Sequence, residues 1–123
     1  MKCLLVIAHG SRREASNNEI RELAGRITEK AGTHFDHIVP AFLELAAPSI
    51  PEGIKICVEK GATEILVMPY FLSAGRHVAE DIPGEVDGVR SLYPGVNIRI
   101  LPYLGSFETI ADMMIEQAVT SST

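Results

Sequence analysis

Residues 2–13 read KCLLVIAHGSRR, and this stretch decides the fold that the sequence predicts. Its first part, Lys2–Ala8, is a near-continuous apolar run, which is typical of a parallel strand buried on both faces. The run gives way to His9, Gly10 and Ser11, with two arginines behind them. A buried strand that ends in polar and flexible residues favours a β-α unit with a site at the carboxyl end of the strand.

The same alternation of strand and helix occurs four times along the chain. Apolar runs and the 3.6-residue period predict strands over about Lys2–Ala8, Asp36–Leu43, Glu64–Tyr70 and Val96–Leu101, and helices over about Glu14–Ala31, Pro51–Lys60, Pro83–Tyr93 and Phe107–Val119. We therefore expect one α/β domain, residues 1–123, with a four-stranded parallel sheet in the order 2-1-3-4 and helices on both faces. The last residues, Thr120–Thr123, are expected to fray.

This strand order brings three separate stretches to one rim of the sheet. Strands one and three are neighbours in it, and the order reverses between them. Ligands of such sheets bind beyond the carboxyl ends of the strands at the reversal. His9 lies just past the first strand, Glu44 just past the second, and His77 a few residues past the third, within FLSAGRHVAEDIP (71–83).

The two histidines of this rim are the first candidates for chemistry. A neutral imidazole accepts protons near physiological pH and is a common ligand for divalent transition metals. The alternative for His9 and His77 is that each is a loop histidine bonded to backbone or water. Because both are expected at the same reversal, the functional and the structural interpretation carry equal weight.

Charged and small residues are expected beside the histidines. Arg12, Arg13 and Arg76 would form a positive rim that suits carboxylates and phosphates, although the first two also fit a solvated helix start. Ser11 either donates to an anion or caps a helix. Glu44 either pairs with an arginine, binds a cation, accepts protons or has a purely structural partner. Glycines in both segments allow close approach of a ligand or simply make turns.

The composition argues against several classes of protein. Hydrophobic residues make up 46% and charged residues 22%, an ordinary globular balance. The net charge of -5 and the acidic pI disfavour a general nucleic-acid binder, which needs a basic face. No apolar run approaches the roughly 20 residues of a membrane helix, and no secretory signal is recognised. Cys3 and Cys57 lie in apolar patterns and predict buried free thiols in a reducing cytoplasm.

Several nucleotide and nucleophile motifs are absent. There is no G-x-x-x-x-G-K-[ST] segment, so use of ATP is not indicated, and no G-x-G-x-x-G follows the first strand. FLSAG (71–75) resembles a nucleophile elbow only until Phe71 takes the place of the first glycine.

Three segments together resemble the signature segments of the small CbiX-type sirohydrochlorin chelatases, relatives of the class II chelatases. They are VIAHGSRREASN (6–17), PAFLELAAPSI (40–50) and VMPYFLSAGRHVAEDIP (67–83). These enzymes insert Co2+, Ni2+ or Fe2+ into a modified tetrapyrrole without ATP, in cobalamin or related biosynthesis. The resemblance covers nearly the whole chain. Larger members carry two such domains in one chain, so the resemblance implies a homodimer here.

The resemblance also implies roles for particular residues. It makes His9 the proton acceptor and a metal ligand, and His77 the second metal ligand. The tetrapyrrole-contacting surface is implied to be Glu44 with the loop Leu72, Ser73, Ala74, Gly75 and Arg76. Since sirohydrochlorin carries many carboxylates at its edge, Ser11, Arg12 and Arg13 are further candidates to bind it. No cofactor beyond the substrate metal ion is implied.

Other functions remain open at this point. Insertion of Co2+ comes first, with Ni2+ as a second metal. The alternatives are Fe2+ insertion for siroheme and a non-catalytic carrier of metal or tetrapyrrole. A histidine phosphatase is more distant, because the arginine that usually precedes its histidine is here Ala8.

Overall fold

The sheet has the predicted order and direction. The structure, a computed structural model, describes residues 1–122. Its four strands, all parallel, lie in the order β2-β1-β3-β4. The strands are β1 (Lys2–Ala8), β2 (His37–Phe42), β3 (Glu64–Pro69) and β4 (Asn97–Ile100). Because β1 and β3 pair side by side, the reversal of strand order falls between them, as the sequence predicts.

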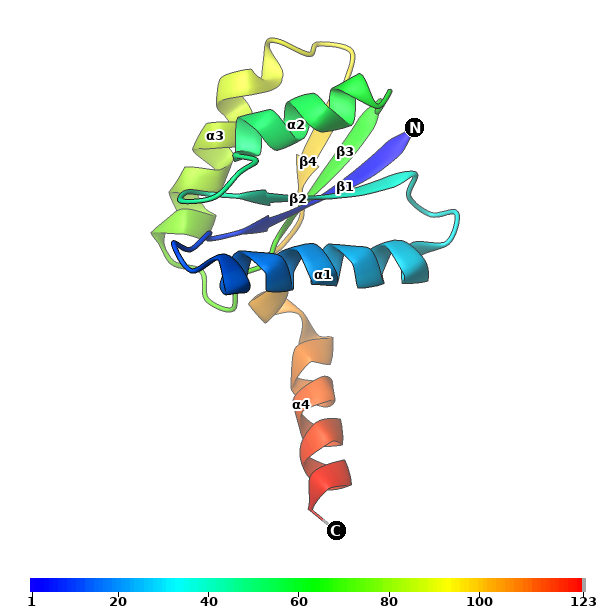
Figure 1. Cartoon of the computed structure of the whole chain (residues 1–123), viewed down its shortest axis with the longest axis vertical. Helices are drawn as coiled ribbons and strands as arrows, with labels where there is room; N and C mark the ends of the chain where they lie inside the picture. The colour runs from blue at the N-terminus through cyan, green and yellow to red at the C-terminus, as the bar shows by residue number, and fades with distance from the viewer. Residues whose placement is uncertain (123) are drawn as a thin grey trace.

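Helices lie on both faces of this sheet, which confirms the predicted fold class. They are α1 (Glu14–Ala31), α2 (Ile50–Glu59), α3 (Ile82–Arg90) and α4 (Glu108–Ser121). A π-helical turn, η1 (His77–Asp81), precedes α3, and a 3-10 turn, η2 (Leu104–Ser106), precedes α4. Figure 1 shows α2 and α3 on one side of the sheet and α1 on the other, with α4 extending away from the body.

The core follows the alternation of the strands. One side chain set, which includes Leu5, Ile7 and Val67, packs under α2 and α3 with Ile54 and Val86. The opposite face holds a smaller buried set: Leu4, Val6 and Leu66. The two sets come from alternate positions of the same strands, as period-2 geometry requires. The strands are thus buried on both faces, as their continuous apolar runs predict.

Two local predictions differ from the structure. The chain is already helical from His77, because a π-helical turn joins the loop to α3 before the proline at which the helix was expected to start. The C-terminal residues were expected to fray from Thr120, but α4 continues through Ser121. The final residue of that predicted frayed segment, Thr123, lies outside the described residues.

The cysteines match their prediction. Cys3 and Cys57 are buried and free. Burial raises the pKa of Cys57 to about 12 and raises the pKa of Cys3 as well. Both thiols are therefore neutral and unreactive at physiological pH. Separately, none of the helices within residues 1–122 is long and apolar enough to cross a bilayer.

Candidate functional site

The structure brings the two candidate histidines together at the rim. His9 follows β1 directly and His77 opens η1, and their ring centroids lie 4.8 Å apart with the ring planes at 35°. The parallel pairing of β1 with β3 carries both chain segments to the same end of the sheet. Their side chains are 49% and 43% exposed, so both imidazoles are open to a ligand.

Each imidazole is bonded to a carboxylate. His9 Nε2 lies 3.0 Å from Glu44 Oε2, and His77 Nδ1 lies 2.7 Å from Asp81 Oδ2. The second nitrogen of each ring is left for a proton or a metal ion. A histidine that ligates a metal typically has its other nitrogen on a carboxylate, which orients the ring and raises its basicity. Glu44 therefore has a structural partner, the histidine, and not the arginine that was one of its expected alternatives.

Asp81 is a site residue that the sequence analysis missed. It lies just before the expected start of the third helix, where the helix dipole alone accounts for an acidic residue. The available signal was the four-residue spacing from His77, which places two side chains on one face only if the segment is helical. Because the chain was expected to be a loop up to Pro83, that spacing carried no weight.

Gly10 sets the distance between His9 and Glu44. Beyond the two strands, the Leu43 amide donates to the Ala8 carbonyl and the Glu44 amide to the His9 carbonyl, at 2.9 and 3.0 Å. Gly10 adopts φ +94°, and a Cβ there would lie 1.8 Å from the Glu44 carbonyl oxygen. Glycine is thus required here both by the backbone conformation and by the lack of space for a side chain. The close approach of the Gly10 and Glu44 backbones places Glu44 beside the His9 imidazole.

Asn17 shapes the loop that follows His9, and sequence reasoning did not single it out. This α1 side chain is 2% exposed. Its Oδ1 accepts from the Ser11 amide at 2.9 Å, and its Nδ2 donates to the Ser11 carbonyl at 2.8 Å. Ser11 Oγ in turn accepts a hydrogen bond from the Arg13 amide at 3.0 Å, so this hydroxyl bonds to the backbone just before α1. The buried amide therefore fixes the backbone next to the histidine.

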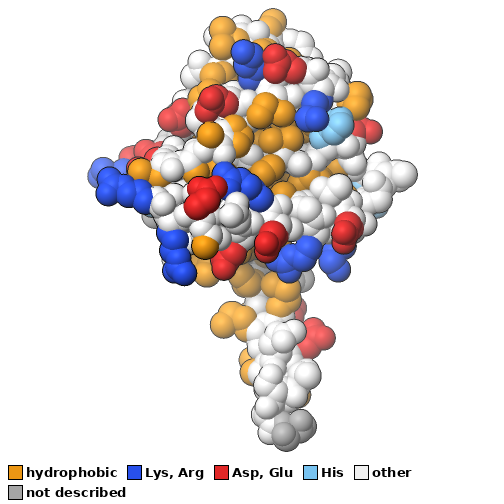
Figure 2. Space-filling model, viewed as in Figure 1, with side chains coloured by type: hydrophobic (Ala, Val, Ile, Leu, Met, Phe, Trp, Pro, Cys, Tyr) orange, Lys and Arg blue, Asp and Glu red, His pale blue; other side chains and the backbone are white. Residues whose placement is uncertain are grey.

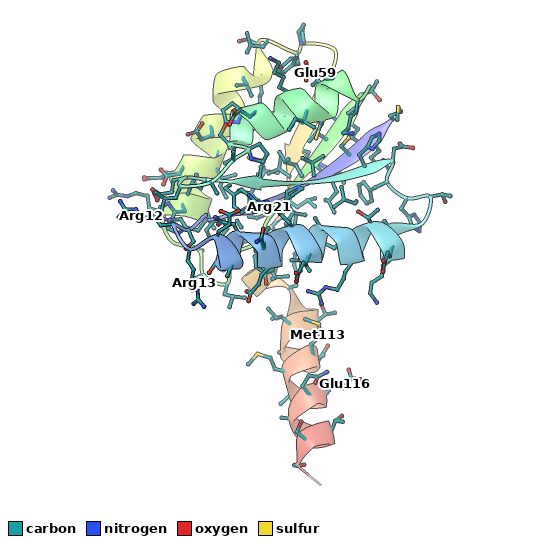
Figure 3. All side chains as sticks on the ribbon, in the orientation of Figure 1. Arg12, Arg13, Arg21, Glu59, Met113 and Glu116 are labelled. Carbon is teal, nitrogen blue, oxygen red and sulfur yellow. The ribbon has the colours of Figure 1, made fainter. Side chains whose placement is uncertain are left out.

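The candidate arginines lie on the surface around this rim. Arg12 and Arg13 are exposed at the start of α1, project outward in Figure 3, and form no ion pair with residues 1–122. Arg76 lies 3.5 Å from Glu80, and both side chains are more than two-thirds exposed. Such an exposed pair holds the guanidinium weakly. All three remain available to carboxylates of a ligand.

The loop between β3 and η1 is open. Its residues Leu72, Ser73, Ala74, Gly75 and Arg76 are all exposed. A Cβ added at Gly75 would meet nothing within 4 Å, so this position has free space in front of its backbone. A flat ligand can therefore approach the loop closely.

Two hollows flank the imidazole pair. One, of about 620 Å³, is lined by the following residues: Leu43, Glu44, Pro51, His77, Glu80, Asp81, Gly84, Glu85, Gly88 and Val89. The other, of about 290 Å³, includes His9, Ser11 and Phe71 in its wall. Within residues 1–122, no set of three or more histidine, cysteine, aspartate or glutamate side chains is placed to hold a metal ion. The rim of one chain therefore offers a metal ion two imidazole ligands, those of His9 and His77.

Comparisons with known proteins agree with the geometry. The family model of CbiX matches residues 3–121. The chloroplastic sirohydrochlorin ferrochelatase of Arabidopsis thaliana is 34% identical over 90% of this chain and 48% of its own length. The sirohydrochlorin cobaltochelatase of Methanococcoides burtonii is 31% identical, over 94% of this chain and 93% of its own.

A solved structure gives the same result. SirB from Bacillus subtilis with Fe3+ superimposes with a TM-score of 0.85 and 30% identity, over 99% of this chain and 48% of that one. The chain spans about half the length of the first curated relatives that it matches. With a family match over nearly every residue and the paired histidines at the rim, the chain belongs to the CbiX family.

Proposed function

We propose that this chain inserts a divalent metal ion, Co2+ first and Ni2+ second, into sirohydrochlorin without ATP. The observation that carries the proposal is the imidazole pair of His9 and His77, 4.8 Å apart with a carboxylate behind each ring. Relatives named as sirohydrochlorin cobaltochelatases support the reaction and the first metal. The lack of a phosphate-binding loop in the sequence supports a reaction without ATP.

The chemistry of insertion needs a proton acceptor and a place to strip water from the metal. Two pyrrole N–H protons leave as the metal enters the ring. His9 takes the first proton on the ring nitrogen that Glu44 does not occupy, and Glu44 stabilises the imidazolium that forms. Because the side chain is 49% exposed, the imidazolium passes this proton to water, and the neutral ring then takes the second proton. His77, held through Nδ1 by Asp81, presents Nε2 to the metal and replaces water ligands during transfer.

The substrate's edge is held by the open surface around the histidines. The exposed loop Leu72–Arg76 offers backbone without steric obstruction at Gly75 and a guanidinium at Arg76. Arg12 and Arg13 add two guanidiniums at the start of α1. Planar guanidinium groups suit the carboxylates of sirohydrochlorin.

We also propose that residues 1–123 act as one chelatase-like domain within a homodimer, with the tetrapyrrole between two facing rims. The half-exposed imidazoles of one rim contact one side of a flat macrocycle, whereas binding sites normally bury most of a ligand. A two-fold interface would supply the second wall and a second copy of His9 and His77. The two free thiols support a reducing, cytoplasmic location.

Insertion of Fe2+ is the second candidate, because other relatives are named sirohydrochlorin ferrochelatases. An anaerobic assay with sirohydrochlorin and Co2+, Ni2+ or Fe2+, followed by the absorption change of the macrocycle, tests the proposal. Turnover with any of these metals supports a chelatase, and the relative rates rank the metals. Stoichiometric binding without turnover would indicate a carrier instead, and hydrolysis of a phosphomonoester would indicate a histidine phosphatase.

A further inference from the structure

The His9–Glu44 pair is formed by two loops that are far apart in the sequence. His9 begins the loop after β1, and Glu44 lies in the loop after β2. The two side chains are 49% and 50% exposed, so core packing fixes neither of them. Side chains of this kind keep a productive geometry only where a rigid element holds the loops that carry them.

The first loop is held by Asn17 of α1. This is the one buried polar side chain within residues 1–122, and it bonds both the amide and the carbonyl of Ser11, two residues after His9. A carboxamide suits this double contact, because it carries an acceptor and a donor side by side. Removal of Asn17 would leave both peptide groups of the loop unpaired.

The second loop is held by Arg21, one turn further along the same helix. Its Nη2 donates to the Ala47 carbonyl at 3.3 Å, and the guanidinium carbon lies 5.3 Å from the centre of the Phe42 ring. Phe42 ends β2, and Ala47 comes three residues after Glu44, so Arg21 contacts the chain on either side of that residue. Figure 3 shows Arg21 reaching from α1 toward the sheet.

Glu14 joins the two contacts. Its Oε2 accepts from Asn17 Nδ2 at 3.3 Å, and its Oε1 accepts from Arg21 Nη1. Hydrogen bonds from Arg21 and Asn17 lower the pKa of Glu14, so the carboxylate stays charged at physiological pH. An exposed ion pair alone contributes little, and Figure 2 shows acidic and basic side chains interspersed over α1. This set differs, because it also bonds Ser11 and Ala47 outside the helix.

We propose that Asn17 and Arg21 are positioning residues that hold the His9–Glu44 pair from both sides. The spacing of positions 14, 17 and 21 places the three side chains on one face of α1, which thereby ties the loop after β1 to the loop after β2. Both residues act through the loops and not on reacting atoms. The inference rests on the proposed function, in which His9 accepts protons, and a misplacement of about 1 Å at such a group can cost about 100-fold in rate.

Arg21→Met tests the contact with the second loop. The variant keeps an apolar stem near Phe42 and removes every donor, and it should fold, since the side chain is 37% exposed. We expect kcat for Co2+ insertion to fall about tenfold, with KM for sirohydrochlorin unchanged. Arg21→Lys should recover part of the loss, because an ammonium replaces only part of the guanidinium's contacts.

Arg26→Met is the matched control on the same helix. Arg26 is exposed and forms no ion pair with residues 1–122, so its loss should leave kcat at the wild-type value. A wild-type kcat in Arg21→Met, or a change confined to KM, would overturn the role of Arg21.

Asn17→Ala tests the contact with the first loop. Its control is Ala24→Gly, which lowers stability at another buried position of α1 without touching the loop. Asn17→Ala should lower kcat about tenfold at a temperature where both variants are folded, and Ala24→Gly should not. Should Asn17→Ala fail to fold, Asn17→Asp keeps the size and the acceptor and removes only the donor to Ser11. An equal fall of kcat in Ala24→Gly would show a general effect of stability and overturn the proposal.

A double variant shows whether Arg21 acts through Glu44. Once Glu44→Ala has removed the pair, the further change Arg21→Met should cost less than about twofold in kcat. Losses that multiply in full would mean that Arg21 acts by another route, and would overturn its role in positioning Glu44.

Crystal structures of Arg21→Met and Asn17→Asp separate this inference from the proposed function. We expect the distance from His9 Nε2 to Glu44 Oε2 to increase from 3.0 Å to beyond about 3.5 Å, where no hydrogen bond remains. An unchanged distance in both variants would refute the positioning, whatever the activity. A wild type that inserts no metal would refute the chelatase, and the two distances would still decide the positioning.

Discussion

Asp81 Oδ2 accepts a hydrogen bond from His77 Nδ1 at 2.7 Å, and the two residues are four apart in the chain within a single π-helical turn. π-helical turns occur frequently at functional sites, and here the turn sets an imidazole against the carboxylate that orients it. The carboxylate occupies Nδ1 and leaves Nε2 of His77 without a bond to it, and the two imidazole rings lie 4.8 Å apart. Positioning of His77 therefore depends on Asp81.

The first prediction concerns Asp81→Asn. Loss of the carboxylate behind a ligating histidine typically costs about 10- to 100-fold in metal affinity or activity, and we expect a loss in that range for Co2+ binding and turnover. Glu80→Gln, which alters the neighbouring acid that faces Arg76, is the matched control and should change neither more than about twofold. Calorimetry with Co2+ and the insertion assay check both variants.

His77→Ala is the reference for this series. It should reduce Co2+ affinity at least as much as Asp81→Asn, and combining the two changes should add little, because both act on one ligand. Partial rescue by Asp81→Glu would support positioning by the carboxylate. Unchanged Co2+ affinity in His77→Ala would remove this histidine from the ligand set.

The second prediction is that His9→Ala nearly abolishes insertion and leaves the fold intact. The side chain is half exposed, so its removal leaves no core cavity. A general base typically contributes about 10²- to 10⁴-fold, and the loss of turnover should fall in that range. Rates are compared at saturating sirohydrochlorin, with thermal melting as the control for folding. Near-normal turnover would show that another group accepts the proton.

The third prediction assigns Arg76 to substrate binding. Its guanidinium is 80% exposed and only loosely paired with Glu80, so it is free to meet a carboxylate at the edge of the macrocycle. A peripheral contact is equally strong in the ground and transition states. Arg76→Ala should therefore raise KM several-fold with little change in kcat. A large fall in kcat at constant KM would instead place Arg76 in the chemical step.

The fourth prediction follows from the buried thiol of Cys57. Burial raises its pKa to about 12, whereas an unfolded cysteine ionises near pH 8.5. The neutral thiol thus stabilises the fold below about pH 8.5, and this contribution is lost as pH rises toward 12. One such group lowers the free energy of unfolding by about 1.4 kcal/mol per pH unit in that window. Denaturant titrations across this pH range give the free energy of unfolding of the wild type and of Cys57→Ala. Because lysine and tyrosine side chains titrate in both proteins, the difference between the two curves reports the thiol alone.

Most of the fold could be predicted because its signals are local and repeated. Continuous apolar runs such as Cys3–Ala8 indicate strands that are buried on both faces, and right-handed crossovers leave few strand orders to consider. The placement of α4 could not be predicted in the same way. Its apolar residues indicate a helix, but which surface they cover depends on contacts outside the helix itself.

The candidate site was predictable to the extent that it depends on topology. His9, Glu44 and His77 each follow a strand, so the strand order alone places them at one rim. Asp81 and Asn17 were missed for different physical reasons. The first depends on a five-residue π-helical turn, which is too short to leave a periodic pattern, and the second on a contact between a helix side chain and a distant loop backbone.

The last prediction concerns Gly10, whose backbone conformation brings Glu44 close to His9. At φ +94° any other residue is strained by about 1–3 kcal/mol, and a Cβ would overlap the Glu44 carbonyl oxygen. Gly10→Ala must therefore push apart the two backbone segments that hold His9 against Glu44. We expect it to lower both the free energy of unfolding and the turnover rate. Gly25→Ala is the matched control: it lies inside α1 with nothing within 4 Å, so it should be neutral or stabilise by up to about 1 kcal/mol. Chemical denaturation and the insertion assay are run on both. If Gly10→Ala kept wild-type turnover, close contact between these backbones would not be needed to set the His9–Glu44 pair.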